Sequence, residues 1–300
     1  MIYTLLTVLT PQDAYNPEAT LIAAARLAKI DVKDIRTIRW ISRSIDSRRF
    51  PAKINAKLEV YVGVNPPKET FQFKIQNVEN EREVHIVGAG PAGYFAALEL
   101  IELGYKPVIL ERGKEISNRK RDVAKLSRNQ EFNPESNYAF GEGGAGTFSD
   151  GKLYTRSKKK DEIRKVLNLF HFHGAQDNIL YDAHPHVGTD VLPEVIENIR
   201  KSILKAGGNV LFEHKVTNMF FSDGKITGVE INETQRISVN ALILATGHSA
   251  RNIYEILNHQ NIPIESKGFA MGVRVEHPQE MINAIQYHTH KYDKWLPPAT

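Results

Sequence analysis

The stretch Val84–Gly113, VHIVGAGPAGYFAALELIELGYKPVILERG, has the order strand, glycine-rich turn, helix and strand. Its first four residues predict a short buried strand, and the apolar residues that recur at helical spacing from position 91 predict a helix. A second apolar run over 107–110 ends at Glu111. A glycine-rich turn between a strand and a helix, with an acid about twenty residues further on, is typical of a dinucleotide-binding unit.

Each residue of the turn Gly88-Ala89-Gly90-Pro91-Ala92-Gly93 has a physical role. Gly88 permits a tight turn out of the strand, Gly90 lets the backbone approach a pyrophosphate, and Gly93 lets the helix pack closely on the strand. The N–H groups and the dipole at the helix N-terminus attract phosphates. Glu111 is placed to accept hydrogen bonds from ribose hydroxyls and would repel a 2′-phosphate, which favours an adenosine without that phosphate. The alternative is a glycine-rich turn that serves packing alone.

Length and composition narrow the class of protein. Three hundred residues suggest about two domains. The net charge is only +4, so composition does not argue for a nucleic-acid partner. We find no apolar span long enough for a membrane helix, and the apolar N-terminus has no positive leader, so we expect a cytoplasmic protein. The absence of cysteine excludes a redox disulfide, a zinc–thiolate site and a cysteinyl flavin link within these residues.

Residues 1–80 predict a separate small α+β module of the β-α-β-β type. We expect a strand over Ile2–Leu9, a helix over Pro17–Lys29 capped by Asn16, and long strands over Asp34–Asp46 and Ala56–Val64. The helix residues expected to face the sheet are Leu21, Ile22, Ala25 and Leu27. The basic residues of the module favour a solvated edge over a nucleic-acid surface; they are Arg43, Arg48, Arg49, Lys53 and Lys57.

Residues 81–262 predict the dinucleotide-binding domain, with an inserted segment at about 114–190, and 263–300 predict the beginning of a substrate domain. The insertion contains a second glycine-rich stretch, Asn137–Leu153, with five glycines, among which stand Phe140 and Phe148. So many glycines suit a loop lying against a flat or anionic ligand, and the two aromatic residues argue against a flexible surface loop. Arg119, Lys120 and Arg121 fall on an expected helix, where exposed charges are the default.

The remaining elements complete a nucleotide-binding sheet. We expect helices over Asp161–His173 and Val191–Ala206, the first with Ile163, Val166, Leu167 and Phe170 on one face and the second capped by Thr189 or Asp190. Asn209–Phe212 and Ala241–Leu244 predict parallel strands. Between them, Val216–Val239 predicts a three-stranded meander with a hairpin turn at Asp223-Gly224. A strand over Phe269–Glu276 and a helix from Pro278 follow.

These motifs resemble the glutathione-reductase-like flavoproteins with two dinucleotide-binding domains. Over nearly the whole chain they are similar, more narrowly, to a bacterial group of uncharacterised FAD-dependent dehydrogenases. The group motifs are FGEGGAGTFSDGKL (Phe140–Leu153), HVGTD (His186–Asp190), ATGHSAR (Ala245–Arg251), GVRVEHP (Gly272–Pro278) and the basic N-terminal stretch Ser44–Arg48. The resemblance implies a Rossmann-like FAD domain made of a parallel sheet plus the meander. Flavoproteins of this kind carry a late Gly-Asp motif that contacts the flavin, and the sequence stops at Thr300 without it, so we expect a fragment.

The resemblance also implies FAD as the cofactor and a set of binding residues. The glycines Gly88, Gly90 and Gly93, with Pro91 and Ala92, hold the pyrophosphate, Glu111 the adenosine ribose, and Arg112 and a backbone group of Val216 the adenine. Gly143 and Gly144 reach the ribityl chain and flavin, and Ala245, Thr246 and Gly247 contact the adenosine diphosphate.

We therefore expect an FAD-dependent oxidoreductase acting on a small molecule, with NAD(P)H open as an electron donor. No catalytic base stands out, and His186 and His248 are the candidates because a histidine titrates near neutrality. His184 and His186 do not have the spacing of a metal site. Two alternatives stay open: a nucleotide-sensing module whose N-terminal domain contacts RNA or a protein, and an NAD-dependent dehydrogenase.

Overall fold

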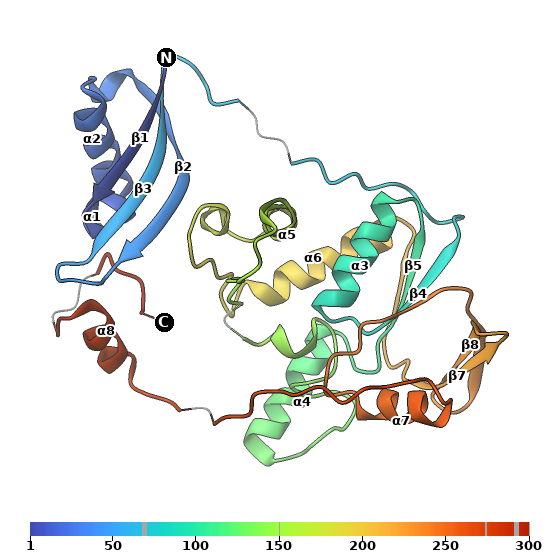
Figure 1. Cartoon of the computed structure of the whole chain (residues 1–300). Coiled ribbons are helices and arrows are strands. Elements are labelled where there is room, and N and C mark those ends of the chain that lie inside the picture. The colour runs from blue at the N-terminus through green and yellow to red at the C-terminus, as the bar shows by residue number, and fades with distance from the viewer. Residues whose placement is uncertain (68–70, 150, 274, 291–293, 300) are drawn as a thin grey trace. The chain divides into compact units, whose positions relative to one another are not determined.

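A computed structural model describes residues 1–67, 71–149, 151–273, 275–290 and 294–299 (Figure 1). The chain folds into two compact units. Unit 1 comprises Met1–Thr70, Asp177–Pro185 and Gly268–Thr300, and unit 2 comprises Phe71–Gln176 and His186–Lys267. This division assigns 71–80 to unit 2 and 177–185, from the expected insertion, to unit 1. Asp150 and Arg274, which belong to two of the quoted motifs, lie outside the described residues.

Unit 1 contains an antiparallel sheet with two helices on one face (Figure 1). Its strands are β1 (Ile2–Leu9), β2 (Ile35–Asp46) and β3 (Lys53–Val62), in the order β1-β3-β2. The helices are α1 (Pro11–Tyr15) and α2 (Pro17–Ala28), followed by a 3₁₀ turn at Val32–Asp34. The expected cap is present, because the Asn16 side chain accepts a hydrogen bond from the Glu18 N–H at 3.1 Å. The β-α-β-β order is confirmed, with α1 as an addition.

The buried face of α2 differs from the expected one. The helix buries Thr20 and the three alanines Ala23–Ala25, whereas Ile22 is 60% exposed and Leu27 is also exposed. Small residues let the helix lie close to the sheet, whose own Ile54 and Leu58 fill the core. The expectation was right for Ala25 and wrong for Ile22 and Leu27, because it counted large apolar side chains instead of the fit between surfaces.

Arg43 is the exception among the five basic residues expected at a solvated edge, because the other four are exposed. Its guanidinium donates to both carboxylate oxygens of Asp182, at 2.7 and 2.9 Å, and lies 4.2 Å from the centre of the Tyr15 ring. Its backbone N–H donates to the Tyr181 carbonyl, and its carbonyl accepts from the Ala183 N–H. Arg43 therefore attaches segment 177–185 to strand β2.

The C-terminal part of unit 1 confirms one expected element and corrects another. Helix α8 (Gln279–Tyr287) begins after Pro278, as expected. The structure assigns no strand to residues 269–273 or 275–276, and Phe269, Met271 and Val273 are more than four-fifths exposed. Apolar alternation describes a strand only when a partner strand accepts its hydrogen bonds.

Unit 2 is built on a four-stranded parallel sheet (Figure 1). Its order is β10-β4-β5-β6, from strands β4 (Glu83–Val87), β5 (Lys106–Leu110), β6 (Asn209–Leu211) and β10 (Leu242–Leu244). Helices α3 (Pro91–Glu102) and α6 (Leu192–Lys205) lie against one face of this sheet. The parallel arrangement brings the carboxyl ends of the strands, and the turns that follow them, to one edge.

The meander packs on the opposite face of the parallel sheet. It consists of β7 (Val216–Ser222), β8 (Lys225–Ile231) and β9 (Gln235–Ser238), and α7 (Arg251–His259) follows β10. Val108 and Leu110 of the sheet share one core with Met219 and Val229 of the meander and Ile253 of α7. The hairpin turn has φ of +50° at Asp223 and +71° at Gly224, the left-handed pair that an Asp-Gly turn favours. The expected fold class is confirmed.

The inserted helices depart from expectation in detail. They are α4 (Ile116–Asn129) and α5 (Lys160–Phe172), with 3₁₀ turns at Gly144–Gly146 and Asp177–Leu180. Helix α5 buries Leu169 and Phe170 but leaves Val166 exposed. Neither Thr189 nor Asp190 caps α6, which starts after Val191 without a side-chain cap.

Among the described residues, no helix is long and apolar enough to cross a lipid bilayer.

Candidate nucleotide site

A cavity of about 610 Å³ lies at the carboxyl ends of β4, β5 and β10. Its size is that of a pocket for a cofactor or a small ligand. The wall includes all but two of the residues expected to bind a cofactor: Gly88, Gly90, Pro91, Ala92, Glu111, Arg112, Gly144, Val216, Ala245, Thr246 and Gly247. The other two, Gly93 and Gly143, are not wall residues.

The first glycine turn packs tightly at Gly88 and Gly93 and leaves open space at Gly90. Gly88 has φ of +108°, and a Cβ there would lie 2.5 Å from the Ala245 carbonyl oxygen. A Cβ on Gly93 would lie 1.9 Å from the Gly88 carbonyl oxygen, so Gly93 serves the contact of α3 with the turn. At Gly90 the nearest atom would be 3.8 Å away, on Gly144. Gly90 thus leaves open space before the first N–H groups of α3, which no side chain caps.

Glu111 has a structural role that the sequence did not predict. Its carboxylate, only 5% exposed, accepts hydrogen bonds from the Ala89 N–H at 2.8 Å, the Gly113 N–H at 2.8 Å and the Gly141 N–H at 3.0 Å. It therefore links the first glycine turn to the second glycine-rich loop. A carboxylate has about four acceptor positions, so one is left for a ribose hydroxyl. The ribose contact stays a prediction.

Arg119 organises the second glycine-rich loop and corrects the expectation of an exposed charge. Its side chain is fully buried and donates to the backbone carbonyls of Asn137, Tyr138, Gly141 and Glu142 and to the Thr147 hydroxyl. Burial lowers the pKa of Arg119 to about 10, against the raising effect of nearby Glu111 and Glu142. The guanidinium is still charged at neutral pH. The loop is therefore built around a buried cation, not a flexible surface segment.

Glu142 and Gly143 join this loop to helix α3. The fully buried Glu142 carboxylate accepts from the Tyr94 hydroxyl at 2.7 Å and from the Ile116 N–H at 2.8 Å. Burial raises the pKa of Glu142, although these hydrogen bonds and Arg200 oppose the shift. The Gly143 N–H donates to the Ala89 carbonyl at 2.8 Å, and a Cβ on Gly143 would meet the Thr147 hydroxyl at 2.2 Å. Gly143 holds the two loops together, and its neighbour Gly144 faces the cavity.

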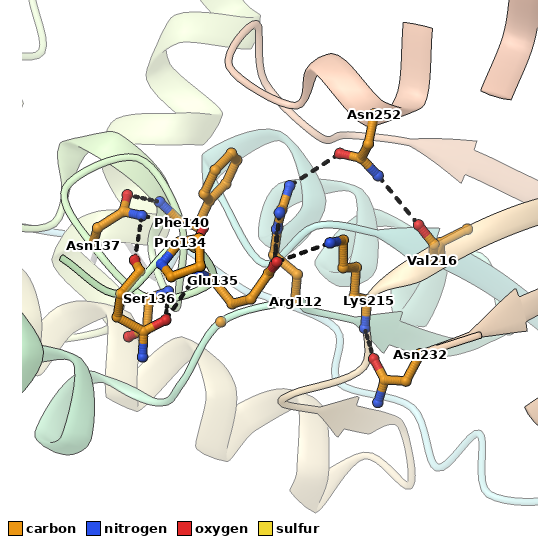
Figure 2. A network of polar contacts seen from close by, with 12 residues as sticks. Arg112, Pro134, Glu135, Ser136, Asn137, Phe140, Lys215, Val216, Asn232 and Asn252 are labelled. Atoms are coloured by element: carbon orange, nitrogen blue, oxygen red, sulfur yellow. Dashed lines mark hydrogen bonds and ion pairs between the residues drawn. The ribbon is translucent and has the colours of Figure 1, made fainter. Parts of the chain in front are cut away.

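Arg112 lies in a polar network at the end of β5 (Figure 2). Its guanidinium pairs with the Glu135 carboxylate at 2.6 Å, and its Nη1 donates to Asn252 Oδ1 at 3.0 Å. The guanidinium carbon lies 3.9 Å from the centre of the Phe140 ring. The Asn252 amide also donates to the Val216 carbonyl at 3.3 Å, so the network joins Arg112 to the start of the meander.

The two candidate histidines fall in different places. His248 lies on the cavity wall, directly after the Ala245–Gly247 turn. His186 is not a wall residue and forms an isolated bridge with Lys152. The structure thus brings His248, and not His186, to the nucleotide cavity.

Four residues of the site escaped the sequence analysis, and a fifth, Arg119, was expected only as an exposed charge. The four are Glu135, Glu142, Lys215 and Asn252. Glu142 lies inside the quoted motif Phe140–Leu153, but the sequence analysis used only the glycines and aromatic residues of that motif. Arg119 and Glu135 come from polar stretches without any motif. Lys215 directly precedes Val216, which is the only signal that could have pointed to it.

Comparisons with known proteins identify the family of the chain. The family model described as pyridine nucleotide-disulphide oxidoreductase matches residues 82–270, more than half of the chain. A model described as FAD-dependent protein, C-terminal domain-like matches residues 268–300, and a domain of unknown function, DUF8436, matches residues 1–61. These matches confirm the expected superfamily and FAD.

An uncharacterized protein of Clostridium beijerinckii is 41% identical over an alignment of 288 residues that covers 87% of this chain and 52% of that protein. The chain thus spans about half the length of this relative. Among solved structures, THI4 of Thermovibrio ammonificans is 17% identical, with 62% of this chain and 63% of that chain covered and a TM-score of 0.41. The L-proline dehydrogenase of P. horikoshii is 15% identical, with coverages of 62% and 58% and a TM-score of 0.34. The chain belongs to the pyridine nucleotide-disulphide oxidoreductase family, and its cofactor is FAD.

Proposed function

We propose that this chain is the FAD-binding part of an enzyme that oxidises or reduces a small molecule through a non-covalently bound flavin. One observation carries the proposal: three glycine-containing turns, at Gly88–Ala92, Gly144–Gly146 and Ala245–Gly247, form the wall of one cavity at the carboxyl ends of parallel strands. Backbone that approaches so closely, next to a helix N-terminus, suits a long phosphate-containing ligand.

We assign the binding roles along that cavity. The Gly88–Ala92 turn and the uncapped N-terminus of α3 hold the pyrophosphate, and the remaining acceptor position of Glu111 binds the adenosine ribose. Arg112 and the backbone at Val216 flank the adenine. Gly144 and the Thr246-Gly247 turn contact the rest of the dinucleotide, while Gly143 and Gly93 act through packing.

The chemistry follows from the bound group and from what surrounds it. FAD, when bound, supplies the hydride or electron transfer. The chain's part is to orient it: Arg119 and Glu111 fix the two glycine-rich loops, so the cavity is formed before the ligand enters. His248, on the wall, is the histidine that we assign to exchange a proton with a bound substrate.

The variant Gly90→Val tests the site. Gly90 has an ordinary φ of −79°, and an added Cβ would meet nothing closer than 3.8 Å, so the variant should fold. Its branched side chain would occupy the space in front of the α3 N-terminus. We expect the dissociation constant for FAD to rise by about 100-fold, because the pyrophosphate loses its approach to the backbone.

The measurement is the visible flavin spectrum that stays with the protein through desalting. Gly268→Val is the matched control, because a Cβ at Gly268 meets nothing within 4 Å and the residue is outside the cavity. Normal FAD retention by Gly90→Val would falsify the placement of the pyrophosphate. A wild-type chain that takes up no FAD would overturn the proposed function.

A further inference from the structure

Two cations form a shared wall between the nucleotide cavity and a second cavity. Arg112 and Lys215 line both the cavity of about 610 Å³ and a neighbouring one of about 300 Å³. Glu135 lines only the smaller cavity. Figure 2 shows the Glu135 carboxylate between the charged ends of Arg112 and Lys215. The acid thus holds both cations from the side of the smaller cavity, while Arg112 also donates to Asn252 on the wall of the larger one.

The contacts of Glu135 use both of its oxygens. Oε2 accepts from Arg112 Nε at 2.7 Å and from Nη2 at 2.6 Å, and Oε1 accepts from Lys215 Nζ at 2.8 Å. Burial alone would raise the pKa of Glu135, but the hydrogen bonds from Lys215 and Arg112 outweigh it and hold the pKa below its usual value. Glu135 is therefore ionised at neutral pH, and its negative charge compensates part of the positive charge of Arg112 and Lys215.

This arrangement bears on the phosphorylation of the ribose. In dinucleotide sites the acid after the second strand binds the ribose 2′-hydroxyl, and an arginine nearby accommodates a 2′-phosphate. Glu111-Arg112 offers both groups side by side. Three backbone N–H groups already compensate the charge of Glu111, so its repulsion of a phosphate is weakened. Arg112 is held by an ion pair with Glu135 and by a hydrogen bond to Asn252, and of these two partners Glu135 is the one that compensates its charge.

We propose that Glu135 is a specificity-determining residue of the nucleotide site. Because of Glu135, the site selects an adenosine with a free 2′-hydroxyl over a 2′-phosphorylated one. Glu135 acts by holding Arg112 and Lys215, the two cations that would otherwise bind the phosphate. This inference rests on the proposed function, because it places the adenosine at the end of β5.

The test uses two probes that differ only in the 2′-phosphate, 5′-AMP and adenosine 2′,5′-bisphosphate. Each displaces FAD from the full chain, and ultrafiltration followed by absorbance gives its affinity. Glu135→Gln keeps the size of the side chain and removes its charge. We expect the affinity for the bisphosphate, relative to AMP, to rise by about tenfold, since one charge-assisted hydrogen bond to phosphate is worth at least that factor.

Glu213→Gln is the matched control, because Glu213 is exposed on the wall of the same smaller cavity and its loss removes the same charge. We expect a change in the ratio of less than about twofold there, by screening of an exposed charge. An equal rise in both variants would mean a general charge effect and would overturn the role of Glu135. Adding Lys215→Gln to Glu135→Gln should cancel part of the gain.

The outcomes separate this inference from the proposed function. An unchanged ratio in a Glu135→Gln protein that retains FAD overturns the inference alone. A wild-type chain that binds neither FAD nor AMP overturns both. If Glu135→Gln fails to fold, Lys215→Gln decides, because it keeps the Arg112–Glu135 pair and leaves the site more negative. It should lower the relative affinity for the bisphosphate, and a rise would contradict the inference.

Discussion

Replacing Arg119 by methionine tests whether a buried cation holds the second glycine-rich loop. Methionine is unbranched like the arginine stem and carries no donor, so the change removes the hydrogen bonds and keeps most of the side-chain volume. The guanidinium donates to four backbone carbonyls and one hydroxyl between residues 137 and 147. Without the guanidinium, these buried acceptors lose a hydrogen-bond donor. Gly144 at the cavity is affected as well, because its carbonyl is contacted by the Thr147 hydroxyl that Arg119 holds.

The size of the effect follows from two opposing contributions. A hydrogen bond from a charged donor contributes about 1.5–3 kcal/mol, but burying a guanidinium costs several kcal/mol. Removing one partner from a buried ionic network usually costs about 3–5 kcal/mol, because the remaining groups stay desolvated. We expect about 3 kcal/mol here, since part of the loop can reach water. For a unit of this size that corresponds to a fall of about 6–12 °C in Tm.

The assay is thermal unfolding of the FAD-loaded protein, followed by the release of flavin, with an FAD titration beside it. We expect Arg119→Met to lower both the Tm and the affinity for FAD. Lys120→Met is the control, because Lys120 is exposed on the same helix and loses the same charge. It should shift the free energy of unfolding by less than about 0.5 kcal/mol. Equal shifts in the two variants would refute the reasoning.

Two further substitutions probe the same loops. In Gly93→Ala the new Cβ would lie 1.9 Å from the Gly88 carbonyl oxygen, so α3 must move. We expect the free energy of unfolding, measured by thermal unfolding, to fall by about 2–3 kcal/mol. Gly268→Ala is the control, and an equal shift in the two variants would contradict the close contact. In Glu111→Gln the amide would turn a donor towards the backbone N–H groups and leave one buried N–H unpaired. We expect the free energy of unfolding to fall by about 1–3 kcal/mol and FAD to bind more weakly in a titration. Unchanged values of both would show that the three N–H contacts do not matter.

The elements that sequence predicted well are those with local causes. The β4–α3–β5 unit follows from an apolar run, a glycine turn and helical spacing within thirty residues. The Asn16 cap and the Asp223-Gly224 hairpin turn likewise depend on neighbours in the chain. These features need no knowledge of distant residues.

The errors arose where distant residues decide. The buried face of α2 consists of alanines because the sheet beneath it supplies the bulk. The alternating segment 269–276 read as a strand, although alternation only makes strand pairing favourable and cannot supply the partner. Arg119 read as a surface charge because no local pattern shows that a loop about twenty residues later wraps around it.

The type of ligand site follows from the sequence, since the spacing of three glycines and an acid is set by backbone sterics and by the charge of a helix N-terminus. The charges around that site depend on tertiary contacts. Arg112, Lys215 and Glu135 are far apart along the chain, and their pairing arises when β5, the insertion and the meander fold against one another. Electrostatic interactions depend on distance and burial, and neither quantity can be read from the order of residues.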